Sequence, residues 1–162
     1  MPTWLLLLSA FSILAFALLG GVFVAFSDFI MRALSLTGGS GGPEAMQAIN
    51  REVYRWIFMV LFMGMVPVSL ALGAGAVLQS TDPAPFIVAA LIYLVGVFGI
   101  TAAFNVPMNN ALAAVDASSA EALAYWSSTY VPDWTFWNSV RAVACLLAAS
   151  AVLYGVIRAA AA

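Results

Sequence analysis

Four long apolar runs are the feature that most constrains the fold of this chain. Their approximate bounds are residues 4–26, 56–78, 86–104 and 140–157. At about 1.5 Å of rise per residue, roughly 20 helical residues cross a hydrocarbon core of about 30 Å. Backbone amides in lipid must find hydrogen-bond partners within their own segment, so we expect each run to be a transmembrane helix. The first run lacks a basic start and exceeds the roughly 7–15 apolar residues of a signal peptide, so we expect a span there too.

The composition supports a membrane protein and excludes several other classes. Apolar residues make up 65% of the 162 and charged residues 7%, whereas a soluble domain has about 45–50% and about 25%. Five Arg and seven acids give a net charge of -2 without basic clusters, so we expect no binding of nucleic acid. The chain has no His, so neither an imidazole base nor an ordinary metal or haem site is expected, and we predict no cofactor. The single Cys145 excludes an internal disulfide.

Helical patterns also occur in the two longer connections between the runs. Residues 37–42 are rich in glycine and break a helix, and Pro43 then gives a favourable helix start that leads into the second run. The spacing of Ser118 and Glu121 predicts a capping box ahead of the fourth run. The sequence therefore predicts an all-α fold, a single membrane domain over residues 1–162. Its core is a four-transmembrane-helix bundle, with extra amphipathic helices in the two longer loops on one membrane face.

Ionisable residues gather at one end of this predicted bundle. With four spans, residues 27–55 and 105–138 share a face opposite both termini. Ten of the twelve ionisable side chains lie on or beside that face: Asp28, Arg32, Glu44, Arg51, Glu52, Arg55, Asp116, Glu121, Asp133 and Arg141. Either the longer loops simply face water beside an interfacial aromatic belt, or part of this set converges on a cavity at the bundle mouth. By the positive-inside tendency, four Arg against one place this face in the cytoplasm.

A polar and aromatic stripe enters the fourth run. Trp134 and Asn138 are four residues apart, as are Trp137 and Arg141, so on a helix they share one face. Arg141 precedes an almost wholly apolar run, and an Arg at that depth needs a partner or must reach the lipid phosphates. The stripe is therefore either a membrane anchor or part of a site.

Asp28 and Arg32 are four residues apart at the end of the first run. This spacing favours a local ion pair, which contributes well under about 1 kcal/mol if it is exposed. Alternatively, a buried Asp28 must find a partner, and Arg141 or Arg55 would then be its counter-ion across the bundle.

Amide side chains cluster around Pro107, just after the third run. Pro107 is expected to break or kink the helix, and Asn105 and Asn109 flank it. Amides both donate and accept, so they suit a polar ligand, although they also cap chain ends as the backbone leaves a membrane. Asn50 and Arg55 form a similar stripe ahead of the second run, where a solvated face is the alternative.

Four motifs in this order resemble the anthrone oxygenase-like family of membrane proteins. They are FSDFIMRAL at residues 26–34, MQAIN at 46–50, NVPMNNAL at 105–112 and WxxWNxxR at 134–141. The resemblance covers about residues 20–155. It implies a bacterial inner-membrane protein in a family whose fungal members oxidise anthrones to anthraquinones with O₂ and without an added cofactor.

The resemblance and the stripes together give a set of candidate site residues. We expect catalytic roles for Asp28, Asn138 and Arg141. We expect substrate-binding roles for Arg32, Asn50, Arg55, Asn105, Asn109, Trp134 and Trp137. Many relatives have a His directly after the position of Asn138, where this chain has Ser139.

A mechanism follows as a hypothesis. A lipophilic phenolic or aromatic substrate enters the bundle mouth from the lipid, and Asp28 removes a proton. Arg141 and the amides of Asn105 and Asn138 stabilise the anion, which passes an electron to O₂ directly and needs no metal. The alternative is a non-catalytic protein that binds a membrane lipid, a quinone or another amphiphile, or that serves as a small partner subunit. Self-association into a homo-oligomer is left open.

Overall fold

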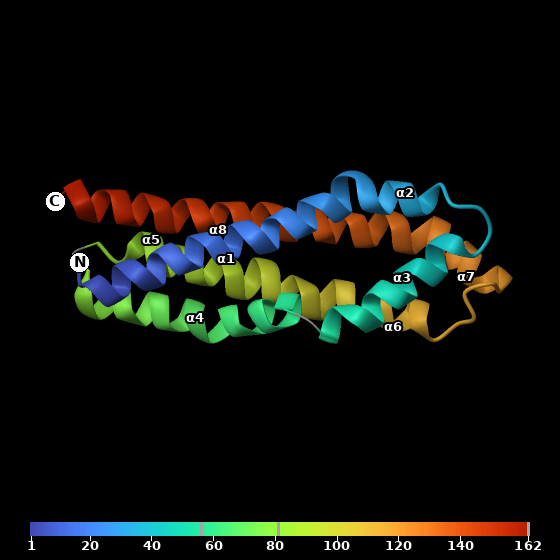
Figure 1. The fold of residues 1–162 in the computed structure, drawn as a ribbon, viewed down its shortest axis with the longest axis horizontal. Coiled ribbons are helices and arrows are strands. Elements are labelled where there is room, and N and C mark those ends of the chain that lie inside the picture. The colour runs from blue at the N-terminus through green and yellow to red at the C-terminus, as the bar shows by residue number, and fades with distance from the viewer. Residues whose placement is uncertain (56, 81, 162) are drawn as a thin grey trace.

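The computed structural model describes residues 1–55, 57–80 and 82–161. Figure 1 shows long helices lying side by side, with both termini at one end of the bundle and α2, α3, α6 and α7 at the other. No strand occurs in the described part of the chain. The prediction of an all-α, four-helix membrane bundle is therefore confirmed. The expected start of the second span, Trp56, lies outside the described residues.

The four long helices are built from shorter elements joined end to end. The first helix (Thr3–Ser35) comprises α1 (Thr3–Ala25), the π-helical η1 (Phe26–Ile30) and α2 (Met31–Ser35). A separate α3 (Gly41–Glu52) and the short 3-10 turn η2 (Val53–Arg55) precede the second helix, α4 (Ile57–Gln79). The third helix (Ala84–Ala113) comprises α5 (Ala84–Leu91), the π-helical η3 (Ile92–Gly99) and η4 (Thr101–Asn105), and α6 (Val106–Ala113). The fourth helix (Ala120–Ala161) comprises α7 (Ala120–Tyr125), the π-helical η5 (Trp126–Trp134) and α8 (Thr135–Ala161).

Three of these helices are longer than a membrane requires. The first, third and fourth contain 33, 30 and 42 residues, and 42 residues extend about 63 Å at 1.5 Å each. A hydrocarbon core of about 30 Å accounts for only part of that length. All four helices are apolar enough to span a membrane, so the chain is an integral membrane protein whose bundle continues past the bilayer.

The expected break at Pro107 does not occur. The third helix continues from η4 into α6, with Pro107 in the first turn of α6. The first turn of a helix needs no N–H donor from its residues, and the wider π turn before it changes the hydrogen-bonding pattern at this point. The helix therefore carries the amides on both sides of Pro107 in one continuous element.

Two hydrophobic clusters hold the bundle together. The first joins α1, α4, α5, η3 and α8 in the membrane half, and Phe16, Met65 and Tyr93 are fully buried in it. The second lies at the loop end, where Met46 of α3 meets Tyr130 of η5. The second cluster explains how the helices stay packed beyond the bilayer.

The cap of α7 differs by one residue from the predicted one. Ser119, not Ser118, accepts the hydrogen bond from the Ala122 N–H at 3.1 Å. The Ser118 backbone N–H and hydroxyl instead donate to the Asp116 carboxylate at 2.9 and 2.8 Å, and these bonds lower the pKa of Asp116. A short turn therefore separates the third and fourth helices at the loop end.

Candidate functional site

A cavity of about 340 Å³ lies where the loop helices meet the membrane half of the bundle. Residues from α1, α3, α4, the third helix and the fourth helix line it. Its walls are mostly aromatic rings and methionines: Phe23, Phe26, Phe58, Phe62, Phe98, Met46, Met59 and Met63. Its polar lining comprises Asn50, Tyr54, Thr101, Asn109, Trp134, Asn138 and Arg141. The cavity is thus an apolar chamber with a few polar groups.

Arg141 is the charged group of this cavity. Its side chain is 5% exposed. Nη2 donates to Asn138 Oδ1 at 2.7 Å and Nη1 donates to Thr101 Oγ1 at 3.1 Å. The guanidinium carbon lies 4.4 Å from the centroid of the Phe23 ring and 5.4 Å from that of Trp134. Within the described residues no carboxylate lies within 4.0 Å of it, and its Nε has no hydrogen-bond partner.

Asn138 is held in place by the first helix. Its Nδ2 donates to the Phe23 backbone carbonyl and to Ser27 Oγ, both at 2.6 Å. Ser139 Oγ donates to the same Ser27 oxygen at 2.9 Å. These contacts use the amide nitrogen of Asn138 and leave its oxygen to accept from Arg141. Asn138 therefore orients the guanidinium within the cavity.

A second polar network fixes Trp134 and closes the loop side of the cavity. Asn109 Oδ1 accepts from Trp134 Nε1 and from the Tyr130 hydroxyl, both at 2.8 Å. Asn50 Nδ2 of α3 donates to the Tyr130 hydroxyl at 3.2 Å. The Trp126, Tyr130 and Trp134 rings stack along η5, with centroids 5.3 and 6.1 Å apart. The Asn109 amide oxygen thus joins α6 to η5, and the Tyr130 hydroxyl joins η5 to α3.

The family model described as anthrone oxygenase matches residues 51–151. The chain belongs to the anthrone oxygenase family. No curated protein and no solved structure matches it. In this anthrone oxygenase family member, the matched stretch includes Asn109, Trp134 and Arg141, whereas Phe23 and Asn50 contribute to the cavity from outside it.

Five of the candidate residues predicted from the sequence line the cavity of this anthrone oxygenase family member: Asn50, Asn109, Trp134, Asn138 and Arg141. Asn105 is 1% exposed and lies behind the wall, where its Nδ2 donates to the Trp134 carbonyl at 3.2 Å. The continuous fourth helix explains the grouping of Trp134, Asn138 and Arg141, which fall at positions i, i+4 and i+7.

The structure does not bring Asp28 and Arg32 to the cavity. Both side chains are exposed, and no ion pair joins Asp28 to Arg32, Arg55 or Arg141 in the described part of the chain. Ser27 faces the fourth helix instead. Neighbouring residues on a helix point roughly 100° apart, so the next side chain, Asp28, points away from the cavity.

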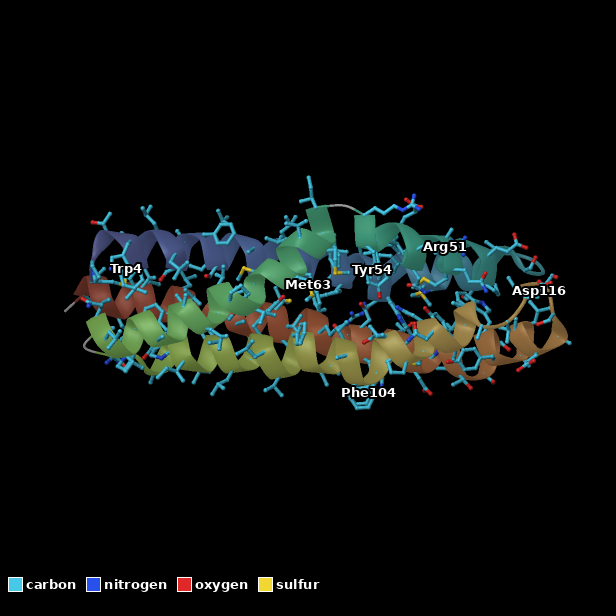
Figure 2. The ribbon with its side chains drawn as sticks, turned by 90° about the horizontal axis from the view of Figure 1, so that it is seen from below. Trp4, Arg51, Tyr54, Met63, Phe104 and Asp116 are labelled. Carbon is cyan, nitrogen blue, oxygen red and sulfur yellow. The ribbon has the colours of Figure 1, made fainter. Side chains whose placement is uncertain are left out.

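Arg55 and Trp137 also lie away from the cavity lining. Arg55 is exposed and pairs with Glu52 at 3.3 Å. Trp137 stacks on Phe104 with ring centroids 3.6 Å apart. Figure 2 shows Phe104 projecting away from the bundle. Neither Arg55 nor Trp137 therefore lines the cavity, and Trp137 is half-buried.

Sequence reasoning missed three contributors to the site: Phe23, Thr101 and Tyr130. Thr101 is a polar residue in an otherwise apolar run, which is a signal that could have drawn attention to it. Tyr130 falls midway between Trp126 and Trp134 at four-residue spacing. Phe23 carries no such signal, because its role depends on which face of α1 packs against α8.

Proposed function

We propose that this protein binds a lipophilic ring compound whose oxygen carries or develops negative charge, and that it oxidises this compound with O₂. One observation carries the proposal: Arg141 is buried in an apolar cavity, with a free Nε and no acidic partner among the described residues. A buried cation is costly unless it is paired. An anionic oxygen of a bound ligand would supply the missing partner.

The cavity walls support a flat, apolar ligand. Phe23 and Trp134 lie against the guanidinium, and Phe58, Phe62 and Met59 extend the apolar surface from there. A volume of about 340 Å³ falls within the range of about 300–1,000 Å³ that small-molecule pockets occupy. A fused-ring ketone fits this chemistry, because its rings suit the walls and its oxygen suits Arg141.

The reaction we propose begins with a substrate that has a CH₂ group conjugated to a carbonyl. Loss of a proton gives an enolate, and Arg141 stabilises the charge on its oxygen. The enolate transfers one electron to O₂, and the resulting substrate radical and superoxide combine to form a carbon–oxygen bond. The protonated hydroperoxide then loses water, so the CH₂ group and O₂ become a second carbonyl and one water molecule.

The proton acceptor in this proposal is solvent rather than Asp28. Among the described residues that line the cavity there is no carboxylate, and the whole chain has no His. A neighbouring cation favours the ionised form of a weak acid. Arg141 would therefore lower the pKa of the substrate C–H and favour loss of its proton to water.

The test is turnover of anthrone in lipid vesicles, measured as O₂ uptake and as appearance of anthraquinone absorbance. Arg141→Gln should lower kcat by about 10²–10³, the usual effect of removing one group that stabilises a developing oxyanion. Arg158→Gln is the matched control, because Arg158 lies at the other end of the bundle beside Asp82, and it should keep full turnover. Full turnover by Arg141→Gln would refute the proposal.

A second candidate function is binding of the same ligand class without oxidation. The lack of a carboxylate in the described cavity lining favours it, because no side chain there is an evident base. Saturable, Arg141-dependent binding of anthrone without O₂ uptake above that of protein-free vesicles would establish this function instead.

A further inference from the structure

The cavity has one side on which its lining is exposed. Of the residues that line it, Tyr54, Met63 and Ala102 are exposed, whereas the others are buried or half-buried. They belong to η2, α4 and η4. Figure 2 shows α4 diverging from the third helix as it approaches α3, with Met63 and Tyr54 in the space between them. Among the described residues, the exposed lining therefore marks an opening between α4 and the third helix.

Packed side chains and a helix cover the cavity on two other sides. Toward the membrane centre, the Phe62 and Phe98 rings stack with centroids 5.9 Å apart and join α4 to η3. Toward the loop end, α3 covers the cavity. Gln47 Nε2 holds α3 by donating to the carbonyls of Leu112 and Val115 at 2.8 and 3.0 Å. The loop side of the cavity is thus covered by a helix that two hydrogen bonds hold in place.

Apolar side chains are exposed on the two helices beside this opening. Met63 lies six residues after the start of α4 at Ile57, or about 9 Å along its axis. The exposed surface on either side is apolar, since Val60 is 75% exposed on α4 and Val95 is 66% exposed on η3. Exposed apolar side chains at this position match a lipid environment.

We propose that the ligand enters and leaves sideways, from the acyl-chain region of the bilayer, between Met63 and Ala102. This inference rests on the proposed function, because it assumes that the cavity binds a ligand. It narrows the substrate class to flat molecules that partition into hydrocarbon and carry their polar oxygen at one edge, which then reaches Arg141. A flexible Met at the opening adapts to such molecules. An analogue with a permanently charged group at its opposite edge should not bind, because that charge would have to cross the hydrocarbon region.

The test compares two neighbouring positions on one helix. Ala102→Trp places a large ring in the opening, whereas Ala103→Trp places the same ring on an exposed position outside the cavity lining. Anaerobic binding of anthrone to the protein in lipid vesicles is followed by anthrone fluorescence. Ala102→Trp should slow both association and dissociation, by about tenfold each, because a narrowed route hinders entry and exit alike. Ala103→Trp should change neither rate.

Met63→Trp gives a second, independent obstruction and should reproduce the slow exchange. Sulfonated anthrone, which carries a fixed charge, should not compete with anthrone. Unchanged rates in both Ala102→Trp and Met63→Trp, or effective competition by the sulfonate, would overturn the lateral route while leaving the proposed function in place. If the unaltered protein binds no anthrone, the proposed function itself is overturned, and the lateral route with it.

Discussion

Arg141 should be a residue whose loss abolishes ligand binding without destabilising the fold. Arg141→Met replaces the guanidinium with an apolar side chain that keeps the packing against Phe23. The substitution removes the hydrogen bonds to Asn138 and Thr101 and the cation–π interaction with the Phe23 ring. It also removes the cost of keeping an unpaired cation in an apolar cavity.

These effects nearly cancel. The bond to Thr101 joins two helices and the bond to Asn138 lies within α8. Such side-chain bonds contribute about 0.6 kcal/mol each, and a guanidinium over an aromatic face contributes about 0.5–2 kcal/mol. An Arg within a membrane helix costs about 2.5–3.5 kcal/mol. The free energy of unfolding of Arg141→Met should therefore lie within roughly 2 kcal/mol of the parent value.

The measurement is unfolding in mixed detergent micelles, with and without ligand. Anthrone at 100 times its Kd should stabilise the parent by about 2.7 kcal/mol and leave Arg141→Met unchanged. Asn138→Leu is the contrasting variant. It leaves Arg141 buried with one partner fewer and should lose about 3 kcal/mol. A comparable loss in Arg141→Met, with ligand stabilisation retained, would show that Arg141 holds the fold together and that its free Nε does not mark a binding site.

Three further predictions concern packing and access. Gly42→Ala should destabilise the protein by about 1–3 kcal/mol in the same unfolding assay, because a Cβ there would lie 2.6 Å from a backbone oxygen of α2. Gly64→Ala should not destabilise the protein, because a Cβ at Gly64 would have no neighbouring atom within 4 Å. Gln47→Leu removes the two hydrogen bonds that hold α3 in place. Amide hydrogen exchange across residues 41–52 should then be faster than in the parent protein, while exchange in α4 is unchanged. The same exchange rates in α3 of the variant and the parent would contradict the role of α3 as a cover. Tyr93→Phe loses a buried bond to a carbonyl of α4 and should cost about 1 kcal/mol; no loss would mean that the bond contributes nothing.

The sequence was sufficient to predict the four helices, because hydrogen bonding in lipid is local to each segment and long apolar runs reveal it directly. It was also sufficient for the spacing of Trp134, Asn138 and Arg141, since residues three and four apart share a helix face without help from neighbouring helices. Asn50 and Asn109 were predicted as candidates from their chemistry and their place at the bundle mouth, and the structure shows that both line the cavity.

Only the tertiary structure decided which face of each helix points inward. The first run is apolar nearly all round, so its sequence pattern does not specify a buried side. Packing against α8 turns Ser27 inward and Asp28 outward, so the residue that the sequence suggested as a base does not line the cavity. The π turns of η1, η4 and η5 further change the rotation of each helix around the cavity. That rotation depends on contacts between helices far apart in the chain, so no local pattern of residues encodes it.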